Sequence, residues 1–201
     1  TLMKILSGFY LADRGDILVD GRPEHYTTPE GAIRAGIGML QQDPLDVGPF
    51  TVLENFVYGR PGGVLPEWKA AREQFQQLNA RLGFDLPLSA TIERLSIAQR
   101  QQLEILRLLA LGVRLLILDE PTTGISAEQK DMLFNSLKRL AREDGLTILF
   151  VSHKLEDVLE LCDEVAVLRL GKLVGTAHLP VTTNDLVAMM FGQELARPPA
   201  A

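Results

Sequence analysis

The sequence predicts an α/β fold, because segments with the pattern of strands alternate with helical segments along the chain. Two runs, 113–118 and 146–151, are apolar but for Arg114 and Thr147. Such runs are typical of strands in a parallel sheet that is covered on both faces. A mostly helical stretch over 51–111 precedes the first of them. We therefore expect a parallel core with a helical subdomain inserted between two core strands.

The first 50 residues are predicted to form two helices and two strands. Gly8 ends the first helix, and the pair Asp20-Gly21 favours a tight hairpin turn. Thr28 with Pro29 marks the start of the second helix. The expected elements are a helix at 2–8, a strand at 15–20, a helix at 28–36 and a buried strand at 36–40, followed by a polar loop at 41–49.

Polar residues are expected to cap three helices in the rest of the chain. Thr51 with Glu54, and Ser96 with Gln99, have the spacing of a capping box, and Ser126 begins a third helix. The expected elements are a helix from Thr51, helix over most of 65–95 with turns at Gly83 and Pro87, helices at 96–111, 126–144, 154–162 and 183–192, strands at 113–118 and 146–151, and a hairpin at 165–177 that turns at Gly171-Lys172.

Composition and charge exclude several classes of protein. The 201 residues are 46% hydrophobic and 23% charged, as in ordinary globular domains, which excludes a mainly disordered chain. With 20 basic and 26 acidic residues the net charge is −6, so the chain lacks the basic field of a non-specific nucleic-acid binder. The single cysteine, Cys162, excludes a disulfide scaffold and is expected to be a small buried apolar residue.

The segment LILDEPTTG places two carboxylates at the end of an apolar strand. In open α/β sheets, ligands bind at the carboxyl ends of the strands. Asp119 is placed there to hold Mg²⁺, which prefers hard oxygen ligands. Glu120 could orient and deprotonate a water that attacks a phosphoryl group. Acidic residues at strand ends are also often simply solvated, so the pair alone leaves both interpretations open.

Three further segments have residue types that suit a phosphate site. His153 follows the next apolar strand, where it can bond a γ-phosphate, although a lone histidine there is usually structural. The segment 95–99, Leu-Ser-Ile-Ala-Gln, places Ser96 and unpaired N–H groups at a helix N-terminus, which suits an anion but also describes any well-capped helix. Gln42 follows the strand at 36–40, and its amide can reach both a metal and the attacking water.

In this order, the four segments resemble the ATP-binding cassette (ABC) ATPases. Gln42 matches the Q-loop glutamine, 95–99 matches the signature LSGGQ with Ile97 and Ala98 in place of two glycines, LILDE matches Walker B, and His153 matches the switch histidine. The chain looks most like the first ATPase domain of tandem importers for simple sugars and nucleosides. The segments that carry this closer resemblance are ILSGFY, AGIGMLQQ, LSIAQRQQLEIL, DEPTTGIS, VSHKLEDVLELCDEVAVLRLGK and AMMFGQEL.

The resemblance implies a P-loop NTPase (RecA-like) core with an inserted helical subdomain and a small antiparallel β portion. It implies four parts: a partial ATPase core with the Q-loop at 1–50, a helical subdomain with the signature at 51–111, the rest of the core at 112–195, and a linker at 196–201.

The resemblance also implies ATP and Mg²⁺ as cofactors, with ATP held between Walker A and B of one domain and the signature helix of another. The implied catalytic residues are Glu120, His153 and Gln42, the implied metal ligands are Asp119 and Gln42, and the implied nucleotide contacts are Thr1, Ser96, Ile97, Ala98 and Gln99.

The sequence departs from the family pattern at three places. Ser126 stands where the D-loop usually ends in aspartate, a departure that the tandem sugar importers often share. Ile97 adds a β-branched side chain where glycine allows backbone to approach phosphate most closely, so we expect a weaker signature contact. No segment matches the phosphate loop GxxxxGK[ST]. In the family this loop runs into a helix like that at 2–6, so Thr1 is expected to be its last residue, with the N-terminal strand and phosphate loop absent from the chain.

The implied function is to couple ATP binding and hydrolysis to transmembrane transport of a small solute, such as a sugar or nucleoside, although the chain alone is expected to be inactive. The implied partners are a second nucleotide-binding domain, transmembrane permease subunits and, indirectly, an extracytoplasmic solute-binding protein, with no nucleic acid. The implied location is peripheral, at the cytoplasmic face of the cell membrane. Two alternatives stay open: a non-catalytic cassette module that supplies its signature helix to a partner site, and a soluble ABC ATPase.

Overall fold

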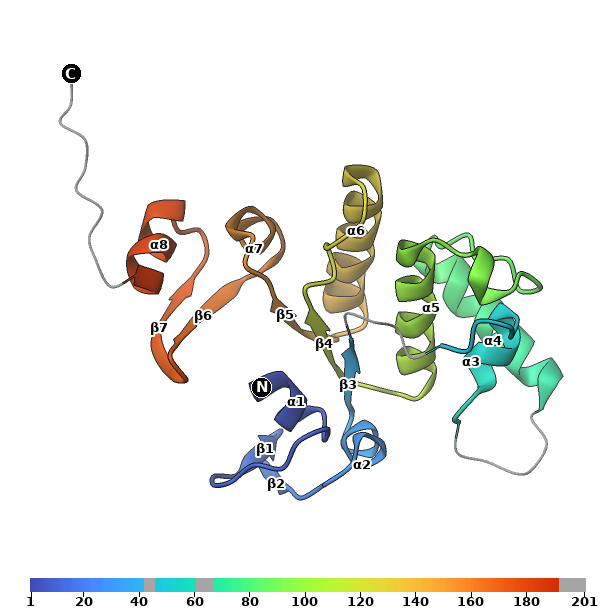
Figure 1. Ribbon diagram of the computed structural model, residues 1–201, viewed down its shortest axis with the longest axis horizontal. Helices are drawn as coiled ribbons and strands as arrows, with labels where there is room; N and C mark the ends of the chain where they lie inside the picture. Colours follow the sequence, from blue (N-terminus) through green and yellow to red (C-terminus); the bar gives the residue numbers. More distant parts are fainter. Residues whose placement is uncertain (42–45, 61–66, 192–201) are drawn as a thin grey trace. The chain divides into compact units, whose positions relative to one another are not determined.

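A computed structural model describes residues 1–41, 46–60 and 67–191 of the chain. The chain divides into two compact units, Thr1–Val151 and Ser152–Ala201, and each is described by itself (Figure 1). The division expected at 50 and 111 remains a prediction, and the expected linker at 196–201 lies outside the described residues.

The first unit begins with a short helix, a hairpin and a second helix. These are α1 (Leu2–Leu6), β1 (Ile17–Val19), β2 (Arg22–Glu24) and α2 (Pro29–Arg34). Asp20 and Gly21 have φ of 52° and 74°, so both central residues of the turn lie in the left-handed region that a two-residue hairpin requires. The Thr28 hydroxyl accepts a hydrogen bond from the Gly31 N–H at 3.2 Å, which confirms the predicted cap of α2.

The core of this unit is a parallel sheet with the order β3-β4-β5. Its strands are β3 (Ile37–Leu40), β4 (Leu115–Asp119) and β5 (Thr147–Val151). β4 begins two residues later than predicted, because the Arg114 and Leu115 N–H groups both donate to the Gly36 carbonyl and the strand ladder starts only there.

Side chains from both faces of the sheet are covered, as the apolar pattern predicts. On one face, Ile37, Met39 and Ile117 pack with Ala32 of α2, and Met3 and Leu6 of α1 lie against them. On the other face, Gly38 lies against Leu108 of α5 (Ile97–Ala110), and Phe150 of β5 makes an edge-on ring contact with Phe134 of α6 (Ala127–Glu143) at 5.8 Å. Because both faces of the sheet are packed, the positions of the strand ends are fixed.

Between β3 and β4 the chain forms a group of helices that pack on one another (Figure 1). They are α3 (Val52–Val57), α4 (Trp68–Leu82), the 3₁₀ turn η1 (Ile92–Arg94) and α5. The rings of Phe56 and Phe75, both fully buried, meet edge-on at 5.1 Å between α3 and α4. The capping boxes predicted at Thr51 and Ser96 are both formed, as is one at Ser126 with Gln129.

The helix predicted over most of 65–95 is shorter in the structure. α4 ends at Leu82, followed by Gly83 at φ 68°, and the chain then runs back along the start of α3. The N–H groups of Val52 and Leu53 donate to the carbonyls of Ala90 and Leu88, so those carbonyls are engaged across the fold and not within a helix.

The second unit contains a hairpin and two helices. Its elements are α7 (Leu155–Leu161), β6 (Glu164–Arg169), β7 (Lys172–His178) and α8 (Thr183–Phe191). The hairpin turns at Leu170-Gly171, with φ of 50° and 75°, one residue earlier than predicted. Cys162 is half-buried, and burial, with the charge of Asp163 adding to it, raises the pKa of its thiol to about 11. None of the described helices is both long and apolar enough to cross a membrane.

Candidate functional site

The predicted carboxylate pair lies at the carboxyl end of β4. Asp119 pairs in register with Val151 of β5, and the next residue, Glu120, donates its N–H to the Val151 carbonyl at 2.9 Å. Glu120 has a φ of 51°, which turns the chain out of the strand immediately after Asp119. Both side chains remain partly exposed, so they can meet a ligand from solvent.

The carboxylates at this strand end suit a hard cation only in part. Asp119 and Glu120 offer oxygen ligands of the kind that Mg²⁺ prefers. Among the described residues, no three His, Cys, Asp or Glu side chains gather closely enough to hold a metal ion by themselves. Any cation at this edge would therefore need further oxygens from water or from a bound phosphate, as is usual for Mg²⁺.

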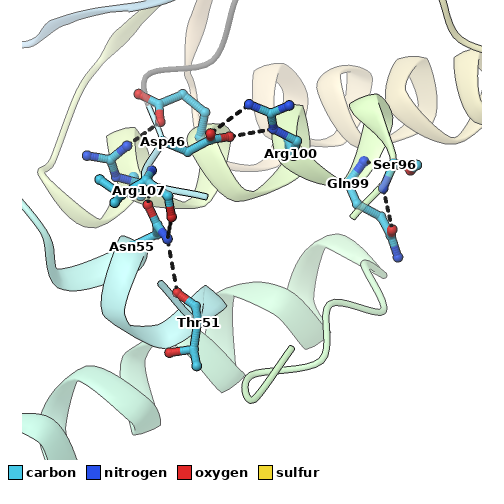
Figure 2. A network of polar contacts seen from close by, with 9 residues as sticks. Asp46, Thr51, Asn55, Ser96, Gln99, Arg100 and Arg107 are labelled. Atoms are coloured by element: carbon cyan, nitrogen blue, oxygen red, sulfur yellow. Dashed lines mark hydrogen bonds and ion pairs between the residues drawn. The ribbon is translucent and has the colours of Figure 1, made fainter. Parts of the chain in front are cut away.

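The predicted signature segment forms the first turn of α5. The Ser96 hydroxyl accepts from the Gln99 N–H at 3.2 Å, and the Gln99 side-chain oxygen accepts from the Ser96 N–H at 3.0 Å (Figure 2). Ala98 is buried, whereas half of the Ile97 side chain is exposed. In the described state, the two polar side chains of the segment therefore bond to the helix end itself.

Ile97 connects this turn to the loop that follows β4. Gly124 has a φ of 79°, and a Cβ at that position would lie 3.7 Å from the Ile97 Cδ1 atom. The signature turn and the loop between Glu120 and Ser126 therefore lie side by side within one chain.

The placement of three other predicted site residues at this strand end stays a prediction. Gln42 lies outside the described residues. His153 is exposed and belongs to the second unit. Thr1 is exposed and precedes α1, and its hydroxyl makes no capping bond.

Sequence reasoning missed a polar cluster that begins just after Gln42. Figure 2 shows Asp46 facing Arg100 of α5, with the Arg100 Nε and Nη2 atoms each donating to a different Asp46 oxygen at 2.6 Å. The Asp46 side chain is 6% exposed and that of Arg100 35% exposed. Two parallel, charge-assisted bonds fix the direction of the pair as well as its distance.

Asn55 of α3 holds the neighbouring residue, Val47, by its backbone. Its side-chain oxygen accepts from the Val47 N–H at 2.8 Å, and its amide donates to the carbonyls of Val47 and Thr51, both at 3.1 Å. Asn55 is fully buried. The only signal in the sequence is an asparagine inside a helix, where it is disfavoured unless its side chain bonds elsewhere.

A second ion pair continues the cluster along α5. Arg107 donates to Glu104 at 2.6 Å and to the Tyr58 carbonyl at 3.1 Å. Burial raises the pKa of the Glu104 carboxyl, the charge and hydrogen bond of Arg107 oppose this rise, and the charge of Asp46 adds to it. The two carboxylates therefore share one electrostatic environment with the arginines of α5.

Comparisons with known proteins give a consistent result. The family pattern described as "ABC transporter" matches residues 1–123. The ribose import ATP-binding protein RbsA 2 of Escherichia coli O157:H7 is 39% identical over 199 residues, which cover 98% of this chain and 39% of that protein. The glucose import ATP-binding protein TsgD13 of Haloferax volcanii is 39% identical over 226 residues, covering 97% and 41%. The chain spans about two fifths of the length of the curated relatives it matches.

Solved structures share the fold. The ADP conformation of MJ1267, an ATP-binding cassette of an ABC transporter, has a TM-score of 0.80 and 23% identity, covering 96% of this chain and 82% of that one. A nucleotide-free ATP-binding cassette from an ABC transporter has a TM-score of 0.78 and 24% identity, covering 88% and 74%. At these identities the likeness is one of fold.

The Asn55 contacts predict a large loss of stability when its amide is removed. Asn55→Leu leaves the Val47 N–H and carbonyl without their partner inside the protein, and each such group costs about 1–3 kcal/mol. We expect the free energy of unfolding, measured with urea, to fall by about 2–4 kcal/mol. The matched control is Asn135→Leu on the exposed side of α6, for which we expect a change within about 0.5 kcal/mol. Equal effects of both variants would contradict the assigned role.

Proposed function

The chain belongs to the ABC transporter family and has the P-loop NTPase fold of its ATP-binding cassettes, and on that premise we propose that it is the ATPase domain of an importer for a small solute. ATP hydrolysis is the activity of the family. The observation that carries the proposal is the placement, in one compact unit, of a carboxylate pair at a sheet edge and a capped signature turn beside the loop that follows it. Their placement supports the proposal of a nucleotide site.

We assign the chemistry at the sheet edge to two neighbouring carboxylates. Asp119 would hold Mg²⁺, which would neutralise charge on the phosphates when bound. Glu120 would accept a proton from the attacking water and orient it, since its carboxylate stands at the turn where the chain leaves β4. His153 and Gln42 match the switch histidine and the Q-loop glutamine of the family, and both would contact the attacking water.

A second nucleotide-binding domain is the partner that this arrangement needs. The first turn of α5 points backbone N–H groups out of the helix N-terminus, which suits a phosphate. In the family, the signature helix closes on ATP held by the opposite domain. Ser96, Ile97, Ala98 and Gln99 would therefore contact nucleotide bound elsewhere than at Asp119 of the same chain.

The transmembrane permease would contact the helical group near 46–58. Phe50 and Tyr58 are both exposed there, and their rings meet edge-on at 5.9 Å. Paired exposed aromatic rings are typical of protein interfaces. The chain would act at the cytoplasmic face of the membrane, with an extracytoplasmic solute-binding protein as an indirect partner. Because relatives are named for ribose and glucose import, a sugar or nucleoside is the solute class we propose.

One alternative is supported by a specific residue. Ile97 in the signature and Ser126 in the following loop both depart from the family pattern. The departure at Ser126 favours a non-catalytic cassette module that supplies its signature helix to a partner site, whereas the weaker signature contact expected from Ile97 argues against such a role. A soluble ABC ATPase has no comparable observation in its favour.

The first test concerns Glu120 in the full-length protein assembled with its permease. Glu120→Gln keeps the size of the side chain but cannot accept the proton, so we expect Mg²⁺-dependent ATP turnover to fall by about 100-fold or more, with ATP binding retained. Glu143→Gln, on an exposed carboxylate at the end of α6, is the control and should keep wild-type turnover. Unchanged turnover in Glu120→Gln would favour the non-catalytic alternative.

The second test concerns the 201-residue polypeptide alone. Since it contains no GxxxxGK[ST] segment, we expect no phosphate release from Mg-ATP above background, while the full-length protein serves as the active control. Sustained turnover by the purified polypeptide would contradict the expectation.

The third test concerns Ile97 in the full-length importer. Ile97→Gly allows closer approach of backbone to phosphate, so we expect a lower KM for ATP and a higher rate of hydrolysis. Ile97→Ala, which keeps a Cβ but removes the branch, should lie between the two. If Ile97→Gly leaves the ATPase rate of the transporter unchanged, the idea of a weakened signature contact is dropped.

A further inference from the structure

The hairpin of β6 and β7 turns through an exposed leucine (Figure 1). Leu170 is 96% exposed and has a φ of 50°, in the left-handed region that bulky side chains rarely adopt. The hairpin of β1 and β2 has the same turn, with Asp20 and Gly21 at φ of 52° and 74°, and aspartate is a residue type that suits this conformation. Packing within the described structure therefore does not account for a leucine at position 170.

The tip of this hairpin has an apolar face and a cationic face. Leu168 pairs in register with Leu173, and Arg169 pairs with Lys172. Because opposed residues share a face and successive residues alternate, the two leucines lie on one face and the two cations on the other. Leu168 and Leu173 are 52% and 60% exposed, and both cations are exposed as well. Leu170 stands at the apex between the two faces.

The tip is a positively charged region of an acidic chain, and it is held by a helix. The segment 165–184 contains no aspartate or glutamate, although the net charge of the chain is −6. Arg169 donates to the Met190 carbonyl of α8 at 3.4 Å. A Cβ at Gly175 would lie 3.3 Å from the Met189 sulfur, so α8 also packs on β7. The leucines and cations are therefore presented by a packed hairpin.

This combination of side chains suits the surface of an anionic lipid bilayer. Exposed leucines can enter the boundary between head groups and acyl chains while neighbouring cations stay with the phosphates. An anionic leaflet attracts each such cation. An acidic protein could supply the negative charge too, but it would need a hollow that matches a leucine at the apex of a turn. A bilayer yields to the shape of the tip, so it fits the observations better.

We propose that the hairpin tip 168–173 is a lipid-contacting element, which inserts Leu170 into the bilayer interface and binds the phosphates of anionic lipids through Arg169 and Lys172. The inference rests on the proposed function only for the location beside a membrane. It adds a direct lipid contact to the attachment through the permease. Because the net charge of the chain is negative, attraction to anionic lipid has to come from a local cationic region such as this tip.

The test measures partitioning of the full-length protein, purified without its permease, onto vesicles of phosphatidylcholine with or without phosphatidylglycerol. We expect binding to the anionic vesicles only, and weaker binding at higher salt because the attraction is screened. Leu170→Asn removes the apolar apex, so the affinity should fall about tenfold. Arg169→Gln and Lys172→Gln should each lower it about fivefold, which is the contribution of one cation at an anionic leaflet.

Matched variants separate the tip from the rest of the surface. Leu11→Asn changes another exposed leucine, 68% exposed, and Lys69→Gln removes an exposed cation from α4. Both should keep the wild-type affinity for the vesicles. Asparagine suits the conformation at position 170, so the Tm of Leu170→Asn should equal or exceed that of the wild type. A loss of affinity in this variant then cannot come from misfolding.

Four results would overturn the inference. They are no binding of the wild-type protein to anionic vesicles, equal affinities of the tip variants and the two controls, lower affinity in the cation variants with none lost in Leu170→Asn, and unchanged vesicle binding of the tip variants with weaker binding to the permease. The last result would assign the tip to a protein partner. All four leave the proposed function intact, whereas an assembled wild-type importer without Mg²⁺-dependent ATP turnover would reject the proposed function and not the vesicle binding.

Discussion

The parallel pairing of three strands is the constraint on which the rest of this molecule depends. Leu40, Leu118 and Phe150 lie in register, so β3, β4 and β5 end at one edge of one sheet. The Glu120 N–H extends that pairing by one bond to the Val151 carbonyl, which fixes where the chain leaves β4. Both faces of the sheet are covered, and in open α/β sheets ligands bind at the carboxyl ends of the strands.

The helices between β3 and β4 add a second requirement. α5 carries the signature turn at its N-terminus, and its apolar side chains pack back toward the sheet through contacts such as Leu108 on Gly38. Its polar side faces segment 46–50, where Arg100 meets Asp46. α5 is therefore held on two sides, by the sheet and by segment 46–50.

The chain belongs to the ABC transporter family but departs from the family's sequence pattern in the signature segment and in the loop after β4. Ile97 stands at a position where the family has glycine, and its side chain lies against Gly124 in the loop after β4. The signature turn is thus packed against a loop of its own domain. The same contact connects the departure at Ile97 with the loop in which Ser126 stands, so the two substitutions belong to one structural region.

Local features that depend only on residues close together in the chain could be predicted from the sequence by itself. The capping boxes at Thr51 and Ser96, the turn at Asp20-Gly21 and the apolar strands follow from bonds and packing preferences within a few residues, and the structure contains all of them. The order of the motifs was also sufficient to predict the family. The start of β4 and the end of α4 were misplaced, because each depends on backbone bonds to a distant segment.

The partners within the polar cluster beside the signature could be identified only from the tertiary structure. Asp46 and Arg100 are 54 residues apart, and neither has a local pattern that points to the other. Asn55 reads in the sequence as an ordinary polar residue, yet it is buried and holds Val47 by its backbone. The physical reason is that a buried charge or amide is tolerated only where folding brings its partner within bonding distance, and that distance is set by the packing of α3, η1 and α5.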